Sequence, residues 1–132
     1  MNEVSEQKLH KVIGDFIEMG HVENIVAMFR HDPSLYAMTG ALLRDERLVV
    51  RMGMTILFEE LVVCRPEEVP LAIPSLVPLL SDSASYIRGD AANLLAIIAT
   101  PAAKEYLVPL VDDPDPLVAE MVREILQEDT PH

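Results

Sequence analysis

The sequence has little of several residue types, and each shortage narrows what the protein can be. A single cysteine, Cys64, among 132 residues excludes an internal disulfide and a cysteine-rich metal site. Aromatic residues make up only 5% of the chain and tryptophan is absent, although half of the residues are hydrophobic. The core must therefore be built from Leu, Ile, Val, Ala and Met, a composition that favours packed helices over a β-sandwich.

Basic residues are also scarce. Ten Lys and Arg stand against 22 Asp and Glu, which gives a net charge of -12. The imbalance is strongest in residues 66–132, which hold 3 basic and 12 acidic side chains. Because nucleic acids and anionic membrane surfaces repel such a chain, we expect neither as a partner. A basic or neutral protein partner fits the charge better.

Long hydrophobic runs are missing as well. The longest candidate, VPLAIPSLVPLL at residues 69–80, is too short for a membrane span and carries three prolines. The opening MNEVSEQKLHK lacks the basic-then-apolar order of a signal peptide. The sequence therefore predicts a soluble, cytoplasmic protein, and its length predicts one domain over residues 1–132.

Helical periodicity is the strongest pattern that is present. In residues 46–64 the apolar side chains recur at the spacing of one buried helix face: Val50, Met54, Leu57, Phe58 and Leu61. Strand-like alternation does not persist anywhere. Gly, Pro and Asp residues divide the chain into segments of helical length, so the predicted fold class is all-α.

The same buried face occurs three times along the chain. The segments LLRDERLVVRMGMTILFEEL (42–61), LLSDSASYIRGDAANLLAII (79–98) and LVDDPDPLVAEMVREILQE (110–128) align with offsets of 37 and 31 residues. This alignment places Asp45, Asp82 and Asp113 at one position. It also aligns four apolar positions: Val50 with Ile87 and Val118, Met54 with Ala91 and Val122, Leu57 with Leu94 and Ile125, and Phe58 with Leu95 and Leu126. Such self-similarity indicates a repeat architecture.

The segments before these repeats share a proline. LVPLLSD (76–82) matches LVPLVDD (107–113), with Pro78 over Pro109. A proline removes a backbone donor and bends a helix, so we expect a kink at both places. Ala41 takes this position in the earliest copy, where we expect a weaker kink.

A kinked helix, a Leu-rich turn with Asp, and a second helix that opens with Val/Ile-Arg together resemble a HEAT repeat. The short spacing is most similar to the HEAT-like repeats of the phycobilisome-lyase type, and the resemblance covers about residues 34–128. It implies a short α-solenoid of stacked antiparallel hairpins, with repeats at 34–65, 66–100 and 101–128. Residues 1–33 match poorly, and we expect them to form a pair of N-terminal helices that caps the stack or a degenerate repeat that continues it.

The resemblance also assigns roles to recurring charges. In the family, Asp and Arg side chains of adjacent repeats form a hydrogen-bonded ladder, and each Asp can cap a second helix. The corresponding residues here are Asp45, Asp82 and Asp113 with Arg51 and Arg88. Ala119 stands where a third Arg would, as suits a last repeat with no following neighbour.

The family's second helices line the concave side, so one flank of each would point away from the core. In this register the flank carries eight candidate partner-binding residues: Ile56, Glu60, Asp90, Asn93, Ile97, Met121, Glu124 and Glu128. The strip is apolar in patches and acidic toward the C-terminus. A partner with Lys or Arg around a small hydrophobic anchor would complement it, although a solvated helix face has the same pattern. Asp90→Lys combined with Glu124→Lys is then expected to weaken binding.

Signals for catalysis, metals or cofactors are weak. VDDPDP at residues 111–116 lacks the turn glycine and distal Glu of a calcium loop, and His10, His21 and His31 lack the spacing of metal ligands. No glycine-rich phosphate loop occurs, and Cys64 has no His partner at a spacing typical of a nucleophile.

We therefore predict a non-enzymatic, cofactor-free adaptor or assembly factor that binds a protein and is a monomer or weak oligomer. The alternative is an accessory enzyme or chromophore-handling protein of the HEAT-repeat lyase type. A HEAT-like DNA-repair enzyme fits poorly with the charge and the absence of a basic strip.

Overall fold

The computed structural model describes the backbone of residues 3–128 and the side chains of residues 5–127. Every regular element in this part of the chain is helical, which confirms the predicted all-α class. None of these helices is both long enough and apolar enough to cross a lipid bilayer.

The helices alternate between short, broken segments and long, continuous ones. The longer helices are α1 (Glu3–Glu18), α2 (Val22–His31), α4 (Leu48–Cys64), α6 (Ser85–Ile98) and α8 (Pro116–Glu128). Short α and 3₁₀ (η) segments connect them: η1 (Pro33–Met38), α3 (Thr39–Leu43), η2 (Val69–Ala72), α5 (Ile73–Leu76), η3 (Val77–Ser81), α7 (Pro101–Leu107) and η4 (Val108–Asp112).

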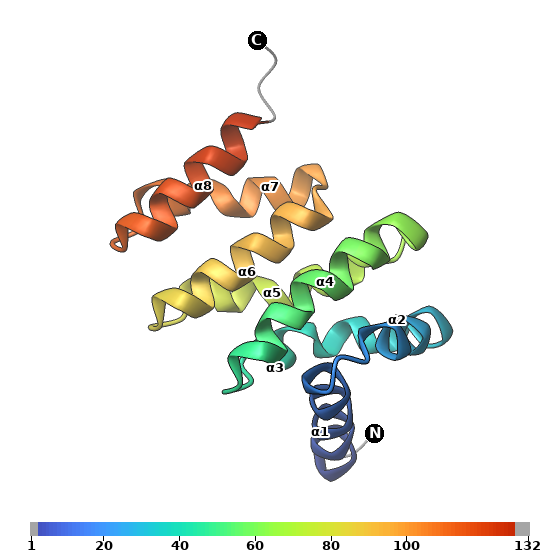
Figure 1. Cartoon of the computed structure of the whole chain (residues 1–132). Helices are drawn as coiled ribbons and strands as arrows, with labels where there is room; N and C mark the ends of the chain where they lie inside the picture. The colour runs from blue at the N-terminus through green and yellow to red at the C-terminus, as the bar shows by residue number, and fades with distance from the viewer. Residues whose placement is uncertain (1–2, 129–132) are drawn as a thin grey trace.

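The long helices α4, α6 and α8 lie side by side and follow one another across the molecule (Figure 1). Helix α6 contacts both α4 and α8, and the broken segments form a second layer behind them. Helices α1 and α2 pack against α4 at the N-terminal end. The described chain therefore begins and ends at opposite ends of the molecule (Figure 1).

Prolines determine the helix geometry in the layer of short segments. Pro78 and Pro109 are the second residues of η3 and η4, whereas the chain around Ala41 stays α-helical in α3. A proline in the first turn of a helical segment loses no hydrogen bond within that segment, because the first N–H groups have no partner there. The preceding helix ends, because the proline has no N–H with which to continue its hydrogen bonds. The predicted kinks thus take the form of a change from α to 3₁₀ geometry.

The core is one continuous apolar cluster between the two layers. The predicted face of α4 is fully buried: Val50, Met54, Leu57, Phe58 and Leu61 all have 0% exposure. The aligned positions Ile87, Ala91, Leu94 and Leu95 of α6 are buried too, as are Val118 and Val122 of α8. At the end of α8, Ile125 and Leu126 are only partly buried against this cluster.

Two glycines permit close helix packing. Gly53 of α4 is buried, and a Cβ there would overlap Cγ2 of Ile17 in α1. Gly40 of α3 donates its N–H to Ser75 Oγ at 3.1 Å, and a Cβ there would overlap the carbonyl oxygen of Ser75. Both glycines therefore lie inside helix contacts rather than at turns.

Candidate protein-binding surface

The candidate residues predicted from the sequence fall on the exposed side of the long-helix layer. We call this the second-helix surface; it comprises Val49, Met52 and Ile56 of α4, Tyr86, Asp90 and Asn93 of α6, and Leu117, Met121 and Glu124 of α8. Ile56 and Glu124 are exposed, whereas Asp90, Asn93 and Met121 are half-buried. Toward the ends of α4 and α6, Glu60 is exposed and Ile97 half-buried; the side chain of Glu128 lies outside the described residues.

Two of the predicted partner-binding residues contact the neighbouring helix. Asn93 Nδ2 donates to Thr55 Oγ1 at 3.0 Å, and Asp90 Oδ2 lies 3.3 Å from Arg51 Nε. Burial raises the pKa of the Asp90 carboxyl, and the nearby Arg51 guanidinium opposes this rise only in part. Asp90 and Asn93 thus join α4 to α6, which leaves them less available to a partner than the sequence suggested.

Arg51 lies at the centre of this contact. Its guanidinium carbon is 4.8 Å from the ring centroid of Tyr86, and its Nη1 donates to the carbonyl oxygens of Asp45 and Glu46 at 2.9 and 3.1 Å. A cation over an aromatic face fixes the ring as well as the cation. Arg51 therefore holds Tyr86 in place on the second-helix surface.

An apolar row crosses this surface at one repeated position. Val49, Tyr86 and Leu117 share the aligned position one residue before the buried Val50, Ile87 and Val118, and they are 47%, 58% and 76% exposed. Leu48 and Met52 widen the row on α4, with exposures of 61% and 60%. Exposed apolar side chains that gather on one face are typical of a protein-binding surface. The sequence prediction missed this row.

Part of the row borders a shallow pocket of about 360 Å³ between α6 and α8. Tyr86 and Leu117 stand at its wall, together with Gly89, Asn93 and Met121. Asp90 and Asp115 supply its negative charge. The pocket thus combines an apolar wall with two carboxylates; of its lining, Asp90, Asn93 and Met121 are residues named from the sequence.

Arg88 in α6 is hydrogen-bonded to the turn before α8. Arg88 Nε and Nη2 donate to the two carboxylate oxygens of Asp113 at 2.8 Å each, while Nη1 donates to the carbonyl oxygen of Asp82 at 2.8 Å. Asp113 also accepts from the backbone N–H of Asp115 at 2.9 Å, just before α8. The Arg88 guanidinium holds the pKa of the Asp113 carboxyl below its usual range.

The recurring Asp and Arg residues nearer the N-terminus have other partners. The carboxylate of Asp82 accepts from the N–H of Ala84 at 2.9 Å and lies 2.7 Å from Arg44 Nη2, rather than pairing with Arg51 as a regular ladder would have it. Arg51 instead reaches Asp90, because Asp90 lies across the α4–α6 contact from it. The ladder expected from the resemblance thus has one bidentate pair, Arg88 with Asp113, and a substitute pair between Arg44 and Asp82.

Asp45 belongs to a charged cluster against α1. Its carboxylate accepts from the backbone N–H, Nε and Nη2 of Arg47, each at 2.9 Å, and lies 3.3 Å from His10 Nε2. Arg47 Nη1 also donates to Asp15 at 2.8 Å. These hydrogen bonds, led by the one from the Arg47 side chain, hold the pKa of the Asp45 carboxyl far below its usual range. The cluster anchors α1 to the turn before α4.

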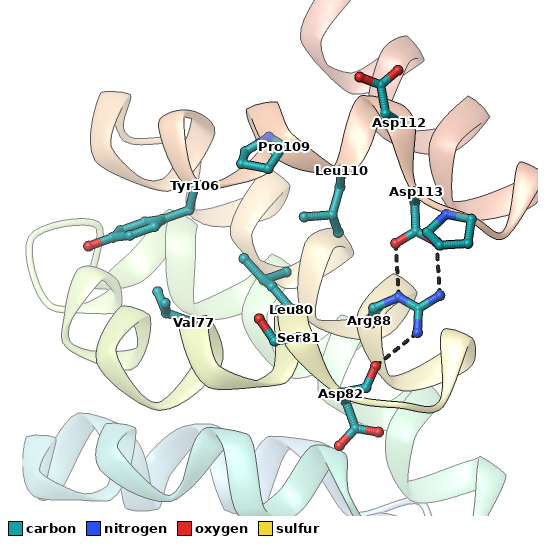
Figure 2. A pocket seen from close by; sticks show the side chains of 11 residues that line it. Val77, Leu80, Ser81, Asp82, Arg88, Tyr106, Pro109, Leu110, Asp112 and Asp113 are labelled. Atoms are coloured by element: carbon teal, nitrogen blue, oxygen red, sulfur yellow. Dashed lines mark hydrogen bonds and ion pairs between the residues drawn. The ribbon is translucent and has the colours of Figure 1, made fainter.

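A second and larger hollow lies between η3 and η4, in the layer of broken helices. We call it the η3–η4 groove; its volume is about 510 Å³, and its apolar lining is Val77, Leu80, Tyr106, Pro109 and Leu110. Figure 2 shows Tyr106 and Val77 close together at one end and Arg88 between Asp82 and Asp113 at the other. Asp112 stands at the rim. Apart from the recurrence of Pro78 and Pro109, no sequence pattern indicates this groove.

The candidate catalytic and metal-binding residues do not lie close together in the described chain. Within the described chain, no three His, Cys, Asp or Glu side chains are grouped closely enough to hold a metal ion. Cys64 is half-buried at the end of α4, and His10 and His21 contact Asp45 and the Phe16 ring respectively. The second-helix surface and the η3–η4 groove are the two features that combine exposed apolar side chains with carboxylates between successive repeats of the aligned pattern. Comparison of the chain with protein-family models, curated proteins and solved structures gives no match.

Proposed function

We propose that this chain is a short α-solenoid of HEAT-like hairpins that binds a protein partner on its second-helix surface and acts as an adaptor or assembly factor. The observation that carries the proposal is the apolar row of Val49, Tyr86 and Leu117. These residues occupy one repeated position, yet all three remain exposed while the next residue of each copy is buried. A repeat that exposes the same apolar position three times presents a continuous binding strip.

The spacing of the row indicates the form of the partner. Packed helices lie about 8–10 Å apart, and seven residues of an α-helix rise about 10.5 Å. An amphipathic helix with apolar residues about seven positions apart, laid across α4, α6 and α8, would therefore meet one member of the row on each helix. The row thus favours a helical partner segment.

The charge around the row indicates the partner's composition. Glu60, Glu120 and Glu124 are exposed on the long-helix layer, and none of them has an ion pair among the described residues. Together with the net charge of -12, they favour a partner segment rich in Lys or Arg. Association should then be faster at low salt than at high salt, because exposed charges are screened.

The test compares two surface variants with a matched control. Tyr86→Ser and Leu117→Ser remove exposed apolar side chains from the row, and Leu71→Ser removes one that is 53% exposed on η2, in the other layer. A tagged chain captures partners from the native lysate at low and high salt, followed by quantitative mass spectrometry. The proposal expects one retained protein that Tyr86→Ser and Leu117→Ser lose and Leu71→Ser keeps; equal retention by all three variants contradicts it.

Asp90→Lys is not a clear test of partner binding, because Asp90 also contributes to the contact between α4 and α6. Asp90→Lys would place a second cation beside Arg51, so a loss of binding could reflect a disturbed α4–α6 contact. Glu120→Lys with Glu124→Lys alters two exposed residues instead. We expect this pair to weaken capture at low salt and to leave the far-ultraviolet circular dichroism spectrum unchanged.

A further inference from the structure

The η3–η4 groove arises from a difference between two equivalent contacts in the broken layer. In the repeat register, Gly40 and Ser75 at the first contact correspond to Val77 and Tyr106 at the second. Gly40 lets α3 and α5 touch through their backbones, with Gly40 N donating to Ser75 Oγ at 3.1 Å. Neither a valine nor a tyrosine permits that approach, and both side chains line the groove.

The groove presents an unused apolar surface. Tyr106 is 46% exposed, Val77 is half-buried and Pro109 is exposed, so the three form a shelf above the buried Leu80 and Leu110. The volume of about 510 Å³ lies within the range of natural ligand pockets. It has room for one or two side chains of a bound peptide.

The three carboxylates at the other end of the groove differ in how tightly a cation already holds them. Asp113 is held by Arg88, and Asp82 lies 2.7 Å from Arg44. Asp112 differs, because its side chain is 90% exposed and its ion pair with the exposed Arg123 is long, at 3.9 Å. An exposed ion pair of this length contributes little to stability, so a positive charge from a bound partner can replace Arg123 at the Asp112 carboxylate.

We propose that the η3–η4 groove is a second peptide-binding site, which takes a segment of a partner protein carrying a bulky apolar side chain next to Lys or Arg. The apolar side chain packs between Tyr106, Val77 and Pro109, and the cation meets Asp112. The site lies in the broken layer, away from the apolar row, so its occupation does not depend on the function proposed for the second-helix surface.

The test uses a defined probe, the peptide acetyl-Gly-Leu-Arg-Gly-amide, titrated into the isotope-labelled full chain and followed by two-dimensional NMR. We expect saturable shifts confined to the backbone amides of the non-proline residues within 77–82 and 106–113. Replacing the Arg of the probe with citrulline, its neutral isostere, should weaken binding about two- to fivefold, as for an exposed ion pair. Tyr106→Ala should weaken it about tenfold through loss of apolar contact.

Two variants test whether the probe contacts Asp112 and whether it binds in the groove rather than on the second-helix surface. Asp112→Asn should abolish the preference for Arg over citrulline, since it removes the exposed carboxylate that the cation would meet. Leu117→Ser should bind the probe as the wild type does, whatever its effect on the second-helix surface. The proposal is overturned if the probe gives no saturable shifts in tens of millimolar peptide, if the shifts lie on α6 and α8 instead, or if citrulline binds equally well.

Discussion

The substitution Gly53→Ala has two opposing effects on the free energy of unfolding. Alanine favours the interior of a helix over glycine by about 1 kcal/mol, so helix propensity alone predicts that the variant is more stable. In the structure, however, a Cβ at residue 53 would overlap Cγ2 of Ile17, which is 3% exposed. Cγ2 is attached directly to the Cβ of Ile17, so it cannot move away as the end of a flexible side chain would.

The magnitude follows from these two terms. Forcing an extra methyl group into a packed contact costs about 1–3 kcal/mol. After the gain in helix propensity of about 1 kcal/mol, Gly53→Ala should lower the free energy of unfolding by roughly 0–2 kcal/mol. Gly89 provides the matched control, because a Cβ there would lie 3.8 Å from Val118 Cγ2 and 3.9 Å from Met121 Cε. These are ordinary contacts, so Gly89→Ala should raise stability by about 1 kcal/mol.

Urea unfolding followed by circular dichroism at 222 nm (the far-ultraviolet helix signal) measures both variants. The two free energies of unfolding should differ by roughly 1–3 kcal/mol, with Gly53→Ala the less stable. Adding Ile17→Leu, which removes the branch at Cβ, should recover part of the loss in Gly53→Ala. If Gly53→Ala stabilises the protein as much as Gly89→Ala does, then α1 does not pack on α4 as the structure has it.

Three further outcomes can be measured on the same protein. Gly40→Ala should destabilise it by about 3 kcal/mol in urea unfolding, because the added Cβ meets the backbone carbonyl of Ser75, which cannot rotate away. Arg88→Ala should lower the urea midpoint more than Arg123→Ala, since Asp113 would lose both of its guanidinium hydrogen bonds, whereas Arg123 lies 3.9 Å from an exposed carboxylate. The third outcome concerns acid. The pKa values of Asp45, Asp82 and Asp113 lie below the unfolded value of 3.8, so thermal unfolding should show stability that is complete above about pH 4 and falls as the pH drops further.

The helical class could be predicted because its cause is local. The apolar spacing of residues 46–64 marks a buried helix face, and the side chains that it selected, from Val50 to Leu61, are fully buried. The recurring Pro78 and Pro109 also marked the places where the first helices change geometry. Both signals act within one helix, so no neighbouring element was needed to interpret them.

The site was harder to predict because it depends on contacts between helices. Asp90 was placed on the flank that meets a partner, but the half-buried carboxylate pairs with Arg51 across the α4–α6 contact. That pairing displaces the expected bond between Arg51 and Asp82, whose carboxylate is occupied by Arg44 instead. The sequence shows which residues recur, but not which of several nearby carboxylates an arginine reaches.

The apolar row could have been found from the sequence alone. Val49, Tyr86 and Leu117 each precede an aligned core residue, so the alignment that located the core also located them. The flank predicted from the register begins one helical turn later, at Asp90 in α6 and Met121 in α8, and so does not include them. The η3–η4 groove could not have been found in this way, because it depends on how closely two backbones approach.

Site-specific photo-crosslinking in the native lysate tests directly whether the second-helix surface binds a partner protein. A photoreactive amino acid replaces Leu117 in the apolar row or, as the control, Leu71 in η2, both of which are well exposed. We expect a discrete protein adduct from position 117 that is absent from position 71, weakens at high salt and disappears when Tyr86→Ser is added. The same adducts from both positions, or an adduct from position 117 that survives Tyr86→Ser, would contradict the assignment of the second-helix surface as the binding face.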